Sequence, residues 1–170
     1  RYQPKTNEEL DCQVEASGTF DASKAFSEPP TSSMIVLAIK YVPGANNRLQ
    51  DGSLLCKSLN ATTPQYVELI KGVAGLRLDF GVGKTDVLEK GVNTYIQQSS
   101  WTVNNGIIRS VRYAMLLASR ENQRDSADSN ILTDWLTSST AAEKTVINAN
   151  DKNRIYQVAG STQTLRNLMP

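Results

Sequence analysis

Two long runs of alternating residues constrain this chain more than any other feature. In the first, Leu76, Leu78 and Phe80 are separated by charged residues. In the second, residues 107–118 (IIRSVRYAMLLA), apolar side chains recur at every second position from Val111 onward. Successive side chains of a strand point to opposite faces, so each run predicts a strand with a covered face. We therefore expect one strand at residues 76–81 and another at residues 107–118.

Four further segments are expected to be strands. Residues 33–42 are apolar on both faces, which predicts a central strand, and a turn at Pro43-Gly44 leads into a hairpin partner at 53–59. Residues 66–70 are interpreted as a strand followed by a tight turn at 71–75, where two glycines weaken a helix, although a helix stays open on spacing. Residues 154–166 are expected to return to the sheet.

The remaining chain is mostly polar. Residues 81–100 form a polar connection with some order near Tyr95, and residues 120–153 form a long polar insertion. Within the insertion, Ile131, Leu132, Trp135 and Leu136 have helical spacing, which predicts one short helix packed by Trp135. The fold class expected is therefore α+β: a predominantly antiparallel β-sheet with one or two short helices, in a single globular domain over residues 1–170.

Composition lowers the prior for several functions. The chain has no histidine, which removes Ser-His-Asp catalysis, imidazole metal ligands and the commonest general base. Its net charge is +1, from 18 basic and 17 acidic residues, which does not favour nucleic acid as a partner. We expect no catalytic residues, no cofactor and no bound metal, and we expect that the chain is not an enzyme.

Three motifs have an ordinary structural interpretation. The run Gly81-Val82-Gly83-Lys84-Thr85 suggests a phosphate loop, but the Walker pattern needs a glycine where Leu78 stands. The acidic residues of the insertion lack the glycine and distal glutamate of an EF-hand loop. Trp101 and Trp135 could stack on sugars, yet a tryptophan in a small β-rich domain is more often a packing anchor.

The chain has two cysteines, Cys12 and Cys56, too far apart for a CxxC motif and too few for a zinc site. Two unrelated buried thiols are one interpretation. We prefer a disulfide, because each cysteine lies in a strand-like context, and an intact disulfide would place the domain in the periplasm or outside the cell.

Several short motifs, taken in order, resemble the PilW family of minor pilins. No single motif is specific to the family, but the order and spacing of the motifs together with the cysteine pair are fairly specific. The matching segments are Arg1-Tyr2-Gln3, Asp11-Cys12, the strand Ile35 to Val42, Leu54-Leu55-Cys56, Val67-Glu68-Leu69 through Gly72-Val73 to Leu76, Phe80-Gly81, Trp101, Val111-Arg112 to Leu116-Leu117, Arg154-Ile155-Tyr156 and Leu165-Arg166-Asn167.

The resemblance implies a pilin-like domain that helps to initiate assembly of a type IV pilus and to cap it, at the periplasmic face of the bacterial inner membrane and at the pilus tip. The implied partners are other minor pilins, the major pilin and a PilY-type tip adhesin. The hydrophobic N-terminal helix of the family has no counterpart here, so the domain is expected to be N-terminally truncated and to touch a membrane only through that missing helix.

Two alternatives stay open. The pseudopilin J proteins of type II secretion share a looser version of the same pattern. A stand-alone extracellular adhesin or carbohydrate-binding module is the alternative from a different class.

Overall fold

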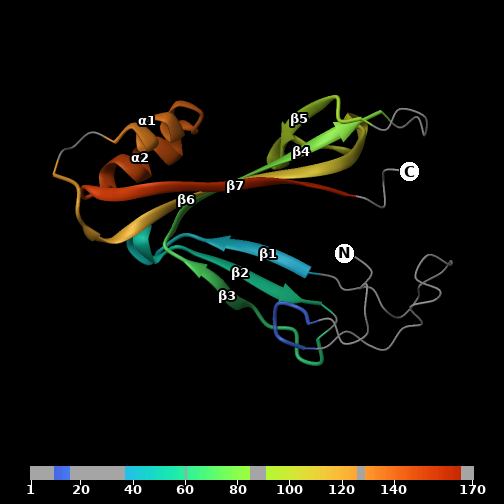
Figure 1. The fold of residues 1–170 in the computed structure, drawn as a ribbon, viewed down its shortest axis with the longest axis horizontal. Coiled ribbons are helices and arrows are strands. Elements are labelled where there is room, and N and C mark those ends of the chain that lie inside the picture. The colour runs from blue at the N-terminus through green and yellow to red at the C-terminus, as the bar shows by residue number, and fades with distance from the viewer. Residues whose placement is uncertain (1–9, 16–36, 60, 85–90, 126–128, 166–170) are drawn as a thin grey trace.

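The computed structural model describes residues 10–15, 37–59, 61–84, 91–125 and 129–165. Within these ranges the strands form two antiparallel sheets, one of three strands in the order β1-β2-β3 and one of four in the order β5-β4-β6-β7 (Figure 1). The elements are β1 (Leu37–Val42), β2 (Ser53–Ser58), β3 (Val67–Lys71), β4 (Val73–Gly83), β5 (Thr94–Gln97), β6 (Ile107–Asn122), α1 (Asn130–Thr137), α2 (Ala141–Asn150) and β7 (Arg154–Thr164). The expected fold class, predominantly antiparallel β with two short helices, is confirmed.

The smaller sheet contains the expected hairpin of β1 and β2, but the central strand of the sheet differs from the expected one. β1 pairs with β2 through a loop in which Asn46 and Asn47 adopt positive φ, a conformation that asparagine tolerates. β3 pairs with the other side of β2, so β2 is central and the expectation that 33–42 is the central strand is wrong. The face of β1 that carries Ile39 is not fully covered, since Ile39 is 51% exposed. Apolar residues on both faces of a strand indicate that both faces are covered by other side chains. They do not indicate how many strands pair with it, because pairing depends on backbone hydrogen bonds along the two edges of the strand. Residues 33–36 lie outside the described ranges.

A single glycine joins the two sheets. The turn expected at 71–75 is reduced to Gly72, which has φ +86°, and β4 begins at Val73 instead of residue 76. The N–H groups of Gly72 and Val73 both donate to the carbonyl of Gly52, and Ala118 N–H donates to the carbonyl of Gly72. The chain therefore leaves one sheet and enters the other without a loop.

The larger sheet is built on the two alternating runs. β4 pairs with β6, with Leu78 opposite Tyr113 and Phe80 opposite Val111, so the large apolar residues of the two runs share one face. β6 is longer than expected and continues to Asn122, while β7 pairs along its outer side. The short strand β5 occupies the other edge, where the sequence predicts only some order near Tyr95.

Both helices pack on the opposite face of the larger sheet, here called the helix face (Figure 1). Trp135 and Leu132 of α1 and Ile147 of α2 are buried against this face, and Leu49 enters the same cluster from the smaller sheet's loop. Each fully buried side chain of this kind contributes about 1.5–3 kcal/mol by leaving water. The buried cluster consists of Leu49, Ala74, Leu116, Leu132, Trp135, Ile147 and Tyr156.

The two helices begin at recognisable caps. Ser129 accepts a hydrogen bond from Leu132 N–H at the start of α1, which is the short helix expected around Trp135. Thr140 and Glu143 form a reciprocal capping box at the start of α2. A separate helix at this position is not among the elements expected by name, although the spacing Thr140-x-x-Glu143 is the sequence signal of a capping box.

Candidate interaction surface

The helices cover only part of the helix face, and the uncovered part forms an open groove. Cross-strand pairs place Arg77 and Asp79 of β4 on the same face as Ala114 and Arg112 of β6. The groove has a volume of about 670 Å³. Its lining includes Arg77, Asp79, Tyr95, Gln97, Arg112, Ser138, Gly160, Ser161 and Thr162, from all four strands and the turn between the helices.

Arg77 forms the wall between the groove and the helices. Its guanidinium lies over the Trp135 ring, 3.8 Å from the ring centroid. It also donates hydrogen bonds of 2.6 Å to Trp135 O, Ser138 Oγ and Ser139 Oγ. Because these carbonyl and hydroxyl oxygens lie at the end of α1 and just beyond it, Arg77 fixes the end of α1 to β4.

Arg112 organises the floor of the groove. Two of its nitrogens donate to Asp79 Oδ2, at 2.9 and 3.1 Å, and its guanidinium stacks on Tyr95 at 4.3 Å from the ring centroid. The pair is largely exposed, so its stabilising effect is small. The charges of Arg112 and Asp79 are paired with each other, and the groove lining mixes polar and apolar side chains, so the surface is suited to contact with another protein.

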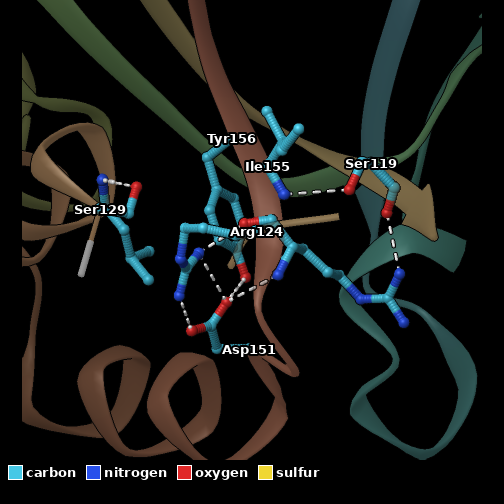
Figure 2. A network of polar contacts seen from close by, with 8 residues as sticks. Ser119, Arg124, Ser129, Asp151, Ile155 and Tyr156 are labelled. Carbon is cyan, nitrogen blue, oxygen red and sulfur yellow. Dashed lines mark hydrogen bonds and ion pairs between the residues drawn. The ribbon is translucent and has the colours of Figure 1, made fainter. Parts of the chain in front are cut away.

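A second polar network holds the far end of the same sheet together (Figure 2). Arg124 binds both carboxylate oxygens of Asp151, and Tyr156 Oη donates to Asp151 Oδ1 at 2.8 Å. Arg154 N–H also donates to this carboxylate, and the Arg154 guanidinium donates to the carbonyls of Ser119 and Arg120. The network therefore connects β6, the end of α2 and the start of β7, where the β6–β7 register shifts.

The network changes the pKa values of two of its members. Burial alone would raise the pKa of Asp151, but the hydrogen bonds from Arg124 and Tyr156 and the positive charge of Arg124 together hold it below its ordinary value. Burial and the hydrogen bond to the Asp151 carboxylate raise the pKa of Tyr156. Both groups thus keep their ordinary neutral-pH charge states, a fixed carboxylate and a neutral phenol, which fits a structural role.

The fold brings Cys12, from the N-terminal segment, next to Cys56 on β2. Cys12 and Cys56 form a disulfide with their Cα atoms 6.2 Å apart, and this linkage attaches residues 10–15 to the central strand of the smaller sheet. Nearby, Gln13 Oε1 accepts hydrogen bonds from the N–H groups of Ser58 and Gln65. The described N-terminal segment is thereby anchored to the smaller sheet at several points.

The other motifs have structural positions. Gly81 and Gly83 lie inside β4, where a Cβ at Gly81 would approach Ser110 Oγ and one at Gly83 would approach Arg109 Nε, so they serve close strand packing. Thr85 and Asp128 lie outside the described residues. In the described ranges no group of three or more His, Cys, Asp or Glu residues could hold a metal ion.

The tryptophans are packed in different ways. Trp135 is buried beneath α1, and Trp101 meets Phe80 edge-on, with 5.9 Å between ring centroids. Neither forms part of the groove. Arg112 and Tyr95, which form the floor of the groove, lie in segments for which the sequence predicts a strand and some order, respectively. Their contact depends on strand register and could not be predicted from their spacing in the sequence.

Comparison with known proteins defines the family. The family model of Type IV Pilus-assembly protein W, PilW, matches residues 41–167, and the chain belongs to this family. The comparison with curated proteins and that with solved structures found no match. Membership of this family gives the chain a role in type IV pilus assembly and associates it with the periplasm and the pilus. PilW is a family of assembly proteins that is not known for enzymatic activity. Among the described helices, none is long and apolar enough to cross a bilayer.

Proposed function

We propose that this protein is a minor pilin that helps to initiate assembly of a type IV pilus and to cap it, through contacts with other pilus subunits. The observation that carries the proposal is the PilW match over residues 41–167, which begins within β1 and covers every later strand and both helices. Its partners are other minor pilins, the major pilin and a PilY-type tip adhesin. Its location is the periplasmic face of the inner membrane and the pilus tip. We also propose that residues 1–170 form a single domain.

The groove on the helix face is our candidate for one contact surface in this assembly. It is open, has both polar and apolar lining, and is supported from below by the paired Arg112 and Asp79. Binding between isolated domains is expected to be weak, because subunits held side by side in an assembly gain effective concentration that free domains lack.

The test is complementation of a strain in which the gene encoding this chain has been deleted. Surface pili are counted and the tagged protein is purified together with its neighbouring minor pilins. Wild type restores both pili and partner recovery. Arg112→Ala, which removes the groove floor, lowers partner recovery, whereas Arg120→Ala, an exposed arginine near the end of the same strand, leaves it unchanged.

One result would contradict the proposed function, and another would contradict the groove as its contact surface. Normal piliation in the deletion strain with no minor pilin recovered would contradict the minor-pilin function and favour the pseudopilin J or adhesin alternative. Equal partner recovery with Arg112→Ala and Arg120→Ala would retain the function but exclude the groove as a contact surface.

A further inference from the structure

Among the described strands, none pairs with the outer side of β7, which is therefore an edge of the larger sheet. β7 is the last strand of the four-stranded sheet and has eleven residues, Arg154–Thr164. From Gln157 to Thr164 all its residues are exposed except Ala159, which is half-buried. A strand in this position presents unpaired backbone N–H and C=O groups to solvent.

The pairing with β6 shows which backbone groups are unpaired. Leu165 N–H donates to Arg109 O, beside the register pair Thr164–Ser110. Hydrogen-bonded residues alternate along an antiparallel strand, so the backbone groups of residues 157, 159, 161 and 163 also point toward β6. The intervening residues Val158, Gly160, Thr162 and Thr164 direct their N–H and C=O groups outward.

The sequence of this edge lacks the usual features that prevent strand pairing. Residues 155–165 (IYQVAGSTQTL) include no charged residue and no proline. The other edge strands of the described sheets differ: β1 carries Lys40 and is followed directly by Pro43, β3 carries Glu68 and Lys71, and β5 has only four residues. Charge, proline and short length are the devices that protect sheet edges, so β7 is the edge left open to another strand.

We propose that the β7 edge binds the β7 edge of a second copy of this chain, in an antiparallel pair that continues the sheet through both copies. The strand is complementary to itself, because an uncharged sequence places no like charges opposite each other. A two-fold axis at Ser161 sets Val158 opposite Thr164 of the second copy and Gly160 opposite Thr162, so that every outward-facing residue meets another outward-facing residue. Facing β-branched side chains such as Val158 and Thr164 also favour strand pairing.

The geometry limits the assembly to a weak dimer. An isologous pair consumes the β7 edge of both copies, so pairing stops at two. One strand pair buries less surface than the roughly 1,200–2,000 Å² of a typical stable interface, so association is expected only at high protein concentration. The dimer does not depend on the function proposed above.

Sedimentation equilibrium of the 170-residue chain from micromolar to millimolar concentration tests the dimer. The apparent mass of wild type is expected to rise toward twice that of the monomer. Thr162→Pro removes an outward-facing N–H without breaking the bonds to β6, so this variant is expected to stay monomeric. Thr162→Ala, the matched control, removes the side chain but keeps the N–H and is expected to associate like wild type.

A cysteine cross-link tests the position of the axis and does not depend on the proline variant. Ser161→Cys places two thiols at the two-fold axis, in a non-hydrogen-bonded pair with Cα atoms about 4.5 Å apart. The chain offers no other free thiol, since Cys12 and Cys56 are bonded to each other. Mild oxidation should therefore link Ser161→Cys into a covalent dimer far faster than Gln163→Cys, whose thiols would lie well apart.

Three results would overturn the proposal. The first is a wild-type protein that stays monomeric at every concentration, and the second is association of Thr162→Pro with the wild-type affinity. The third is growth into assemblies larger than two, which an edge-to-edge dimer does not allow. Equal cross-linking of Ser161→Cys and Gln163→Cys would overturn the antiparallel register centred on Ser161.

Discussion

At the scale of single residues, Asp151 has the most consequential position in this fold. It accepts hydrogen bonds from Arg124 and Tyr156 at the point where α2 ends and β7 begins. The Asp151 and Arg124 side chains are only 17% and 11% exposed, so the loss of either would leave a charged group poorly compensated.

Asp151→Asn is expected to lower the free energy of unfolding at pH 7 by about 1–3 kcal/mol, because the charge-assisted bonds to Arg124 are weakened. The folded-state pKa of Asp151 lies below the ordinary value of 3.8, so its stabilising effect is complete above that value and is lost as the pH falls through the lowered pKa. Urea unfolding should show the gap between variant and wild type narrowing as the pH falls below 3.8 and through the lowered pKa. Asp134→Asn, an exposed position on α1, is the control, and a gap that persists unchanged at low pH would contradict the assignment.

Gly72 is the second residue on which the architecture depends. Its φ of +86° is accessible to glycine but strained for other residues, and a Cβ would come within 3.3 Å of Ala118 O. Gly72→Ala is therefore expected to cost about 1–3 kcal/mol of unfolding free energy. Thermal and urea unfolding measure it, with Gly91→Ala as the control because no atom approaches a Cβ there. Equal stability of the two variants would show that the junction relaxes freely.

At the scale of elements, α1 is anchored to the sheet by the buried side chains of Trp135 and Leu132, of which Trp135 is the larger. Trp135 packs against Gly75, where a Cβ would lie 3.0 Å from the indole, and the Arg77 guanidinium lies over the Trp135 ring. The small residue in β4 and the large one in α1 are thus complementary, which explains why Gly75 lies within a strand.

Trp135→Ala is expected to destabilise the protein by about 3–5 kcal/mol, because it opens a cavity in the buried cluster. It should also release Arg77 and so alter the wall of the groove. Chemical denaturation measures the first effect. Ile131→Ala on the same helix, where the side chain is 43% exposed, should cost much less. Comparable losses from both would mean that α1 is not anchored through Trp135.

At the scale of the whole molecule, the two sheets meet at Gly72 and around Leu49, and diverge from there (Figure 1). Tyr41 Oη donates to Ala74 O at 3.1 Å across the junction. Away from the junction, the smaller sheet has its own fixed point in the disulfide between Cys12 and Cys56.

Loss of this disulfide is expected to lower the free energy of unfolding by about 4 kcal/mol in the chain-entropy model, given a sequence separation of 44 residues. Urea unfolding of the Cys12→Ser, Cys56→Ser double variant measures the loss. Alkylation of denatured, unreduced wild-type protein followed by mass spectrometry should modify neither cysteine. Two modified cysteines would refute the linkage and weaken the argument for an oxidising compartment.

The sequence by itself located most of the strands, because alternation is a local property: β2, β4, β6, β7 and the helix α1 follow from residue patterns. The short strand β5 and the exact ends of β4 and β6 do not follow from these patterns. The PilW resemblance follows from short motifs of the same sequence. It did not determine which strands are neighbours. Hydrogen bonds along strand edges join residues far apart in the chain, and no side-chain pattern reports them, so β2 replaced β1 at the centre of the smaller sheet. The groove of Arg112 and Tyr95, the Arg124–Asp151 network and the open edge of β7 all depend on that register, and only the tertiary structure decided them.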